Sequence, residues 1–512
     1  MTTSASDAVL HGEAVHHKRP SLRVLPAPRT RTPRVAVIGG GIAGLTAAHS
    51  LLGATDGRAH VTVFEAAGQV GGKLQVSEVA GVPLDEGAES MQSSRPEAVG
   101  LARSVGLDRD IVHPEVIGVS LWVRDRLRRM PPTFMGVPTD LRALTASGVL
   151  PLRTVLRLPL EYAAPATRFE NDVSVGAFVE SRLGRKVVDA LVEPILGGVY
   201  AGRADALSMQ ATVPALFREL RHEKSLLKAV ERTSRGGGRS AGARRGPVFA
   251  GIRGGVGRLP QAVAAHVKSL GGTVRTGVQV QSLHRLDDHW RLIVASAEGP
   301  EVVEAEEVIV ALPPHEASAL LAHICPPAAN DLGLIDMSSM AVVGLAYPAD
   351  AVRPMSGSGF LVSPTEGRMV KAATYASCKW DWIARAARTR RGGPGSMVMI
   401  RASVGRLGEE DLLERDDADL VGDIHEELAE AIGISRPPVD FRVTRWMEAL
   451  PQYATGHVRR VERIRSVIAG VHGLELCGAA FDGVGVAAVV GGARVAAEAV
   501  AQRLEVAATG RG

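Results

Sequence analysis

Gly39, Gly41 and Gly44 form a Gly-x-Gly-x-x-Gly motif directly after the apolar stretch 34–38. The first glycine permits a tight turn, the second lets the main chain approach a phosphate, and the third lets the next helix pack closely on the strand. The positive end of that helix then offers unpaired N–H groups to negative charge. The motif therefore predicts a dinucleotide pyrophosphate on the loop Gly39, Gly40, Gly41, Ile42, Ala43 and Gly44.

Glu65 ends a second apolar stretch, 60–64, and lies 21 residues after Gly44. A carboxylate at the end of the second strand of a βαβ unit accepts hydrogen bonds from ribose hydroxyls. The same carboxylate would repel the 2′-phosphate of NADP. We therefore expect an adenine dinucleotide other than NADP, held at this end by Glu65 and the adjoining Ala66.

Two further glycine-rich stretches bear on the choice between NAD and FAD. Gly71 and Gly72 precede Lys73, which suits a phosphate or a flavin but also suits a surface turn. Residues 478–485, Gly-Ala-Ala-Phe-Asp-Gly-Val-Gly, are rich in glycine and small residues and lead into the last apolar segment of the chain. The N-terminus of a helix starting there would stabilise the negative charge that a flavin ring gains on reduction. A plain glycine loop after a strand is the alternative interpretation of 478–485.

Several stretches together resemble one family. Val37 to Leu45 and Gly71 to Leu74 are typical of the flavin amine oxidase superfamily. The stretch Glu193-Pro-Ile-Leu-Gly-Gly-Val-Tyr-Ala-Gly202 and the motif Arg445-Trp446-x-x-x-x-Pro451-Gln452-Tyr453-x-x-Gly456-His457 are more specific. They resemble the FAD-dependent protoporphyrinogen and coproporphyrinogen oxidases, and the similarity spans residues 34–504.

The resemblance implies a fold and a reaction. The fold class is α/β with an α+β second domain: a Rossmann-type FAD-binding domain built from discontinuous segments, a mixed-sheet substrate domain and a helical insertion. The reaction removes six electrons from a porphyrinogen, reduces O2 to peroxide and serves haem synthesis. The chain is most similar to the soluble bacterial kind, which implies coproporphyrinogen III as substrate, non-covalent FAD and a cytoplasmic location. Protoporphyrinogen IX and the substrates of other flavin amine oxidases or desaturases stay open as alternatives, as does a non-catalytic FAD carrier.

The resemblance also carries over site residues. It implies no catalytic side chain, because the flavin accepts the hydride at N5. Arg95 falls where relatives have a cation for a substrate propionate, and Gly198 falls where a glycine permits close approach of the macrocycle. The implied cofactor residues beyond the ADP-binding loop and Glu65 are Lys73, Gly87, Ala88, Glu89, Ser90, Val280, Trp446, Gly483, Val484, Gly485 and Val486.

Two departures from the family pattern are visible. The family continues its last Gly-x-Gly with Ile-Pro-Asp, whereas this chain has Val486-Ala487-Ala488. A proline at the first helical position would preorganise the helix start, so its absence should soften that start. The family pattern Ser-Phe-Leu reads Ser90-Met91-Gln92 here, which puts the substrate contacts near Arg95 in doubt.

Apolar periodicity places these residues on elements. It predicts helices over 43–52, 258–270, 417–432 and 486–504 and many short helices over 139–227. The predicted strands are 34–38, 60–64, 273–283, 290–296, 306–311, 340–347, 397–404 and 474–477. We expect a disordered tail over 1–33; an FAD-binding domain from 34–97, 248–325 and 440–505; a substrate domain from 98–138, 205–230 and 326–439; a helical insertion over 139–204; and a mobile Gly/Arg loop over 231–247.

Charge and composition exclude several classes of protein. The 512 residues include 59 Lys and Arg and 55 Asp and Glu, a net charge of +4, and the first 34 residues alone carry six basic and two acidic residues. No basic stripe interleaved with aromatics occurs, so we expect no nucleic-acid partner. No run of 18 apolar residues predicts a membrane-spanning helix. No Cys–His spacing indicates a metal site.

The remaining partner predictions concern the surface. Residues 139–163 are amphipathic, with leucines among Arg142, Arg153 and Arg157. An ordinary core helix with a solvated arginine face is the preferred interpretation; peripheral membrane contact and the lip of a substrate entry are the alternatives. The partners expected are a porphyrinogen and O2, with a downstream haem-pathway enzyme as a further alternative. His457 is expected to be a hydrogen-bonded structural residue rather than a base.

Overall fold

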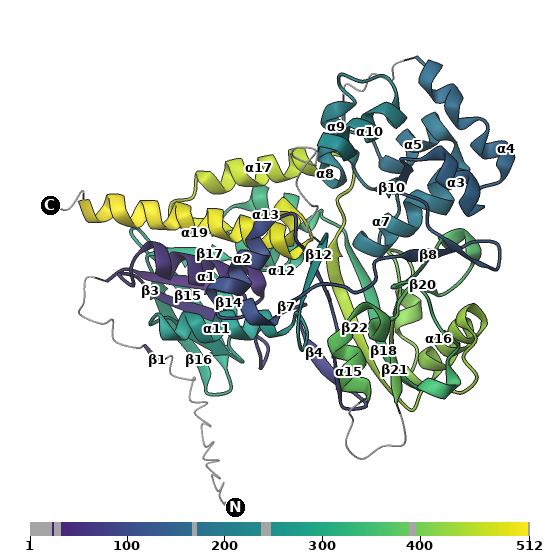
Figure 1. Cartoon of the computed structure of the whole chain (residues 1–512). Helices are drawn as coiled ribbons and strands as arrows, with labels where there is room; N and C mark the ends of the chain where they lie inside the picture. The colour runs from purple at the N-terminus through teal and green to yellow at the C-terminus, as the bar shows by residue number, and fades with distance from the viewer. Residues whose placement is uncertain (1–22, 25–31, 166–170, 237–246, 389–395, 510–512) are drawn as a thin grey trace, which may run out of the picture.

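The computed structural model describes residues 23–24, 32–165, 171–236, 247–388 and 396–509. Figure 1 shows two lobes joined side by side. One lobe holds a parallel sheet covered by long helices. The other holds a larger, mostly antiparallel sheet with a group of short helices above it.

The parallel sheet has the order β13-β3-β2-β17-β23, and all its neighbouring strands run parallel. Its strands come from distant parts of the chain, as the Rossmann prediction requires. The apolar runs of the central strands β2 and β17 are buried on both faces, as expected of a parallel sheet. The strands are β2 (Arg34–Ile38), β3 (His60–Glu65), β13 (Thr273–Thr276), β17 (Glu307–Val310) and β23 (Leu474–Leu476).

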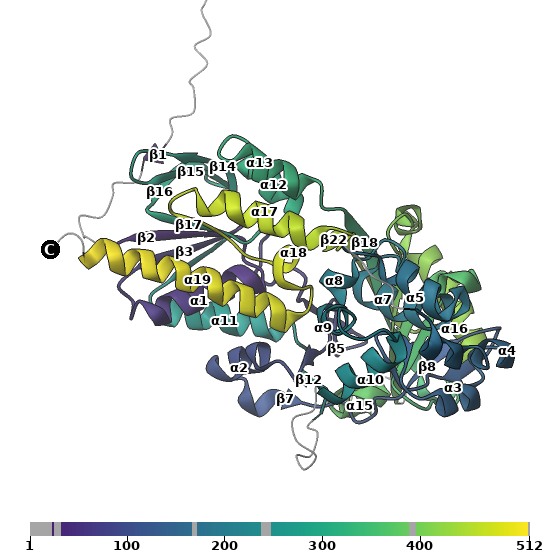
Figure 2. The ribbon, with the colours of Figure 1, turned by 90° about the horizontal axis from the view of Figure 1, so that it is seen from above.

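Each face of this sheet has its own core (Figure 2). On one face pack α1 (Ile42–Ala54), α2 (Pro96–Ser104), α11 (Arg258–Ser269) and α19 (Val486–Thr509). On the other pack the strands β14 (Gln279–Arg285), β15 (Trp290–Ser296) and β16 (Gly299–Ala305) with α12 (Pro314–Leu321), α13 (Pro326–Gly333) and α17 (His457–Ala469). Full burial of one leucine or valine here contributes about 1.5–3 kcal/mol.

The second lobe is built on a sheet with the order β22-β18-β21-β20-β19-β8-β9. Only β19 and β8 pair in parallel. The strands are β8 (Val119–Trp122), β9 (Leu127–Arg129), β18 (Met337–Pro348), β19 (Gly359–Val362), β20 (Val370–Thr374), β21 (Met397–Val404) and β22 (Asp440–Pro451).

Side chains alternate between the two faces of this sheet. Ile400, Ala402 and Val404 lie on the face covered by α16 (Asp417–Ile432). Met399, Arg401 and Ser403 therefore lie on the opposite face. One end of that opposite face is covered by the hairpin β4 (Val76–Val79)–β5 (Val82–Asp85) and by α14 (Ala376–Lys379) and α15 (Asp381–Arg388).

The short helices form a third core above the same sheet (Figure 1). They are α3 (Leu141–Ser147), α4 (Leu152–Val155), α5 (Val175–Leu183), α6 (Arg185–Val187), α7 (Glu193–Tyr200), α8 (Met209–Thr212), α9 (Pro214–Glu219) and α10 (Leu226–Gly236). The 3-10 turn Leu158–Ala163 and the π-helical turn Val188–Val192 belong to the same group. Leu121 and Tyr453, on strands or loops of the neighbouring sheet, pack into this core.

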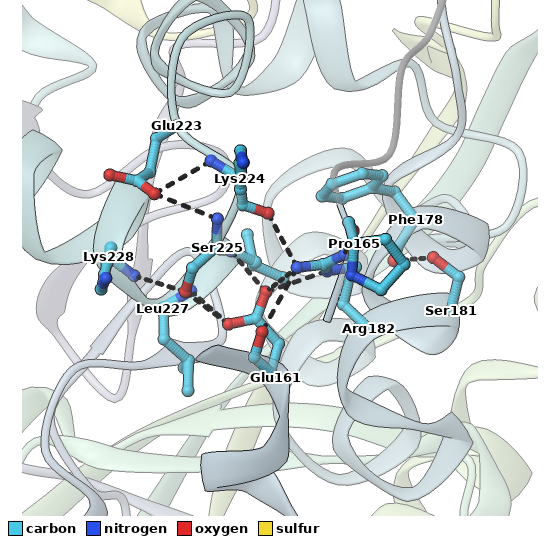
Figure 3. Close-up of polar contacts among 11 residues, drawn as sticks. Glu161, Pro165, Phe178, Ser181, Arg182, Glu223, Lys224, Ser225, Leu227 and Lys228 are labelled. Atoms are coloured by element: carbon cyan, nitrogen blue, oxygen red, sulfur yellow. Dashed lines mark hydrogen bonds and ion pairs between the residues drawn. The ribbon is translucent and has the colours of Figure 1, made fainter. Parts of the chain in front are cut away.

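A buried polar cluster ties this helical group together (Figure 3). Glu161 accepts hydrogen bonds from Arg182 Nε (2.9 Å) and Nη2 (2.6 Å). It also accepts from Ser225 Oγ (2.5 Å) and from the backbone N–H of Leu226 (2.6 Å). The carboxylate thus joins the 3-10 turn, α5 and the start of α10. We call Glu161, Arg182, Ser225 and Leu226 the Glu161 cluster.

The boundaries of the lobes differ in part from the predicted domains. β22, which the sequence assigns to the FAD-binding domain, lies in the seven-stranded sheet beside β18. α8 to α10, assigned to the substrate domain, share the core of the helical insertion. Both differences have one cause. The apolar face of an element packs against the elements nearest to it in space, whatever their distance in the sequence. α10 is helical to Gly236, and residues 237–246 of the predicted Gly/Arg loop lie outside the described residues.

Smaller elements complete the chain. Residues 1–22 and 25–31 of the predicted tail lie outside the described residues, whereas Arg23–Val24 form β1 beside Glu301 and Val302 of β16. The others are β6 (Met91–Gln92), β7 (Ile111–Val112), β10 (Thr133–Phe134), β11 (Val137–Pro138), β12 (Phe249–Ile252) and α18 (Ala479–Asp482). The predicted strand 273–283 is two strands, because Gly277, with φ +68°, turns the chain between them.

Candidate active site

The first glycine loop has the geometry of a phosphate cradle. Gly39 has φ +111°, and a Cβ there would lie 2.6 Å from the carbonyl oxygen of Ala311. A Cβ at Gly44 would lie 2.0 Å from the carbonyl oxygen of Gly39. At Gly41, by contrast, no described heavy atom lies within 4 Å of an added Cβ. The loop is therefore packed tightly behind and open in front, which fits a pyrophosphate.

The start of α1 faces this open side. The first bond of the helix runs from Leu45 N to Gly41 O (3.0 Å). The N–H groups of the turn before Leu45 are consequently available to an anion. Ile42 and Ala43 lie in this turn, whereas the N–H of Gly40 is used within the protein by Glu65.

Glu65 organises the loop as well as facing the ribose position. Its Oε2 accepts from Gly40 N (2.7 Å) and its Oε1 from Ala67 N (2.8 Å). Each carboxylate oxygen keeps a further lone pair for a hydroxyl group. Val278 N donates to Glu65 O (2.9 Å), which brings the start of β14, with half-buried Val280, to the end of β3. Glu65, Ala66 and Val280 are thus close together, and their assignment to the cofactor stays a prediction.

A second group of predicted residues meets between the lobes. A Cβ on Gly87 would lie 1.9 Å from Lys73 O, so only glycine allows this contact. Trp446, on β22, donates from Nε1 to Glu86 O (2.8 Å). Burial lowers the pKa of Lys73, and the charge of Glu316 opposes that shift. Lys73, Gly87 and Trp446 therefore form one contiguous group, with Ala88 and Ser90 on the same segment.

Glu89 in this segment is held by two cations from the other lobe. Lys379 Nζ lies 2.5 Å and Arg401 Nη1 2.7 Å from its carboxylate oxygens. Arg401 Nη2 also donates to Gly87 O (2.6 Å). Burial alone would raise the pKa of Glu89, but the charges of Lys379 and Arg401 outweigh it and lower the pKa to about 2. We call Glu89, Lys379 and Arg401 the Glu89 triad.

The C-terminal glycine stretch gives a second open helix start. Gly483 has φ +132°, and no described atom lies within 4 Å of an added Cβ at Gly485. The first bonds run from Ala488 and Val489 N to Gly485 O (2.9 and 3.1 Å). α19 begins at Val486 although the family proline is absent, so its N-terminal N–H groups are still presented to a ligand.

The two most specific motifs pack against each other. Gln452 Nε2 donates to Tyr200 O (2.8 Å), and a Cβ on Gly202 would lie 2.0 Å from Gln452 Oε1. The rings of Tyr200 and Tyr453 lie 5.7 Å apart between their centroids. The motif at 445–457 therefore joins the helical insertion to the sheet.

His457 belongs to this joint. Its ring stacks on Tyr453 at 4.2 Å, and its Nε2 is hydrogen-bonded to Ala480 O (2.8 Å). Burial lowers the pKa of His457 to about 4, so the ring is neutral near pH 7. The structure agrees with the predicted structural role: His457 and Tyr453, whose hydroxyl donates to Ala479 O, hold the segment that leads to Gly483.

Part of the seven-stranded sheet is left open towards α7. Met340, Ala372, Ser403, Thr444 and Trp446 all lie on the face opposite α16 and are half-buried. Gly198 of α7 is exposed, and an added Cβ there would lie 3.7 Å from Leu361 Cδ2 on the same face. These residues form a half-buried strip of the sheet with Trp446 at one end, and Gly198 of α7 lies over the strip at Leu361.

Arg95 is exposed and precedes the first residue of α2. Burial raises the pKa of Tyr200 to about 12, and the charge of Arg95 opposes that shift, which places Arg95 near the C-terminal end of α7. Arg95 also lines a surface hollow of about 780 Å³ formed with α17 and α19. Arg95 is therefore close to the helix that carries Gly198, but its charge is largely solvated.

Sequence reasoning missed several site residues. Arg401 and Lys371 are basic residues inside apolar strands, and that conflict is the signal that could have found them. Lys371 is 2% exposed, donates to Gly405 O (2.7 Å), and has its pKa lowered to about 7 by burial. Asp85 is also buried, and burial raises its pKa to about 6 against the opposing charge of Arg401.

The described residues form neither a metal site nor a membrane-spanning helix. No three His, Cys, Asp or Glu side chains within the described ranges are placed to share a metal ion. No helix in that part of the chain combines the length and apolar character needed to cross a membrane.

The fold and the two helix starts define the class: an FAD-dependent oxidoreductase whose cofactor domain is assembled from separated segments. The family model of the flavin containing amine oxidoreductases matches residues 42–504, and the chain belongs to that family. Coproporphyrinogen III oxidase of Mycobacterium tuberculosis is 33% identical over 93% of this chain and 99% of its own. The enzyme of the same name from Bacillus subtilis is 29% identical over 88% and 94%.

Solved structures agree with the fold. A putative protoporphyrinogen oxidase from Exiguobacterium superposes with a TM-score of 0.79 at 26% identity, covering 92% of this chain and 99% of the other. UDP-galactopyranose mutase superposes with a TM-score of 0.68 at 16% identity, covering 93% and 94%, and shows the fold alone.

Proposed function

We propose that this protein oxidises coproporphyrinogen III to coproporphyrin III, with O2 as the final acceptor and peroxide as its product. The observation that carries the proposal is the half-buried strip of the seven-stranded sheet between Trp446 and α7, formed by Met340, Ala372, Ser403 and Thr444. Gly198, exposed on α7, lies over the strip at Leu361. A flat ring can lie along such a surface. The similarity to the coproporphyrinogen III oxidases supports this substrate.

The residues of the chain divide the work. When bound, FAD supplies the hydride acceptor. The glycine loop, Glu65 and Val280 hold its ADP half. Lys73, the segment Gly87–Ser90, Trp446 and the start of α19 position its ring beside the half-buried strip of the sheet. Arg95, which lies near the C-terminal end of α7, attracts a propionate of the substrate. The side chains of the macrocycle thus determine how the ring is positioned and take no part in the oxidation.

Porphyrin fluorescence tests the proposal directly. Coproporphyrinogen III and protoporphyrinogen IX are supplied side by side to the FAD-loaded protein, with peroxide measured in parallel. We expect porphyrin from coproporphyrinogen III at the higher kcat/KM, and one peroxide for each two electrons. Faster turnover of protoporphyrinogen IX, the substrate in the name of a 28% identical Arabidopsis relative, would replace the substrate. No bleaching of the flavin by either porphyrinogen, with bleaching by an amine, would overturn the reaction class.

We propose in addition that the protein is cytoplasmic and contacts an anionic membrane surface peripherally. Leu152, Leu156 and Leu160 recur every four residues and are 60%, 69% and 68% exposed. Arg153 and Arg157 are exposed beside them. Exposed leucines flanked by arginines are typical of interfacial helices. The preferred interpretation from the sequence, a core helix with a solvated arginine face, accounts for the buried Leu144 and Leu158. It does not account for the exposed ridge, by which we mean Leu152, Leu156 and Leu160.

Flotation with vesicles tests the ridge. We expect binding to vesicles with anionic lipid and much less to neutral ones. The double change Leu156→Asp and Leu160→Asp should abolish flotation, whereas Leu334→Asp, at an exposed leucine of the other lobe, should not. Equal flotation of both variants would contradict the contact. A downstream haem-pathway enzyme as partner stays a prediction.

A further inference from the structure

Arg401 is a buried cation that the known motifs do not include. It lies on β21 opposite Gly344, is 8% exposed, and points to the face of the sheet that carries Trp446. The missing side chain at Gly344 matters, because an added Cβ there would lie 3.1 Å from Val79 and 3.2 Å from Leu84. The hairpin β4–β5 can therefore lie close to the sheet, and it brings the segment that follows it to Arg401.

On the side assigned to the flavin, the hydrogen bonds of Arg401 are made to this segment. Two of its nitrogens bind Gly87 O and Glu89, at 2.6 and 2.7 Å. Its Nε is buried and has no hydrogen-bond partner among the described residues. A buried donor without a partner is costly, and in native sites it commonly awaits a ligand or an ordered water. Trp446 holds the adjoining Glu86 O, so the same segment is fixed at two successive residues.

The charges around the segment do not cancel by pairing. The Glu89 triad has two cations for one carboxylate. The second buried carboxylate near Arg401 is Asp85, which accepts from Gly257 N (3.0 Å) rather than from a cation. Above its pKa of about 6, the charge of Asp85 offsets part of the charge of Arg401. The triad by itself carries a net positive charge beside Gly87, Lys73 and Trp446, the residues assigned to the flavin ring.

We propose that Arg401 is a positioning residue for the flavin: it fixes the segment Gly87–Ser90 through Gly87 O and Glu89, and with Lys379 it places positive charge beside the ring. Positive charge near the ring stabilises the negative charge that reduction adds, which raises the reduction potential. The inference rests on the proposed placement of the ring at Trp446.

Dye-coupled redox titration of the FAD-loaded protein tests the charge. Arg401→Gln should lower the midpoint potential by about 30 mV, a tenfold change in the two-electron equilibrium. Lys379→Gln should shift it in the same direction. Glu89→Gln removes the negative member and should raise the potential. Shifts of the same sign for Arg401→Gln and Glu89→Gln would overturn the proposal, because general loosening of the site has no reason to change sign.

Further variants address two cases: that Arg401→Gln does not fold, and that Arg401 has a purely structural role. Arg401→Lys keeps the charge but loses the fork to Gly87 O; its potential should match the wild type while FAD dissociates faster. A potential as low as that of Arg401→Gln would contradict the electrostatic part, and wild-type FAD dissociation would contradict the positioning part. If Arg401→Gln does not fold, the opposite signs expected for Lys379→Gln and Glu89→Gln decide the matter.

A control and a placement test complete the experiment. Arg368 pairs with Glu430 (2.7 and 2.8 Å) at the start of β20 and stacks on Trp122, which packs in the core of the other face. Arg368→Gln should leave the potential unchanged. Trp446→Phe should shift the flavin absorption bands if the ring lies there. An unshifted spectrum would overturn the placement, whereas a shifted spectrum with an unchanged potential in Arg401→Gln would overturn only the role of Arg401.

Discussion

Two buried glutamates, Glu161 and Glu89, are each held by arginine, yet their surroundings differ. Glu161 meets one cation, one hydroxyl and a helix N-terminus within the helical insertion. Among the described residues, none of the buried side-chain N or O atoms of the Glu161 cluster lacks a partner. Glu89 meets two cations from another lobe, and Arg401 Nε is left without a partner.

The difference separates a structural network from a site. A polar network in which each member is satisfied specifies one packing arrangement and has no capacity for a ligand. The Glu89 triad keeps an unused donor and a net charge, and it lies where three segments of the two lobes meet. Burial and ion pairing alone therefore do not mark a functional group; the unused donor of Arg401 and the surplus cation distinguish the Glu89 triad from the Glu161 cluster.

The largest effect is expected at the Glu161 cluster. Glu161→Ala removes the carboxylate that binds Arg182, a side chain only 4% exposed, and should lower the free energy of unfolding by about 3–5 kcal/mol. Urea unfolding measures this, while the flavin spectrum of the folded fraction should not change. Glu180→Ala, which removes an exposed pair with Arg185 at 3.5 Å, is the control and should cost under about 1 kcal/mol. Equal losses in both variants would remove the distinction.

The second-largest expected effect is a pH dependence of the free energy of unfolding, caused by Asp85 near the Glu89 triad. The pKa of Asp85 is raised from 3.8 to about 6, so the folded state binds this proton more tightly than the unfolded chain. The resulting stability is complete below about pH 4 and is lost as the pH rises through 6, by about 3 kcal/mol. Asp85→Asn should flatten the unfolding free energy between pH 4.5 and 7 and raise it at pH 7. An unaltered slope would show that Asp85 does not titrate there. Glu89 acts in the opposite sense: its stability is lost as the pH falls from 4.5 through about 2.

Glu65 resembles Glu89 rather than Glu161, because its carboxylate both stabilises the folded loop and is assigned to a ligand. Glu65→Ala should weaken FAD binding by about 1.5–3 kcal/mol, roughly ten- to a hundredfold, through lost ribose bonds and a loosened Gly40. Retention of FAD on ultrafiltration measures it, with Glu78→Ala on the exposed edge of β4 as control. Wild-type retention would remove the role assigned to Glu65.

The smallest effect belongs to the exposed cation. Arg95→Ala should raise KM for coproporphyrinogen III up to about fivefold with little change in kcat, because an exposed ion pair is worth about 0.2–1 kcal/mol. Arg103→Ala, at the other end of α2 and paired with Asp108, is the control. A KM equal to that of the wild type refutes the propionate contact and leaves the buried triad as the better candidate for electrostatic control.

Much of the cofactor site could be predicted from the sequence. The spacing of Gly39, Gly41 and Gly44 predicts their places, because one local turn determines all three. The helix over 417–432 is confirmed at both ends, since Asp416 and Gly433 bound an amphipathic pattern. The partners of Arg401 could not be predicted, because they lie more than 300 residues away in the chain; the one local signal is a single charge inside an apolar strand.

By itself the sequence determined the nucleotide loop, the resemblance to one oxidase family and most of the regular elements, since each depends on short-range spacing and periodicity. Only the tertiary structure decided that β22 belongs with β18, that Tyr200 meets Gln452 and Tyr453, and that Glu89 is bound by two cations. These contacts join residues distant in the chain, and which distant surfaces meet is settled by the burial of whole elements against one another.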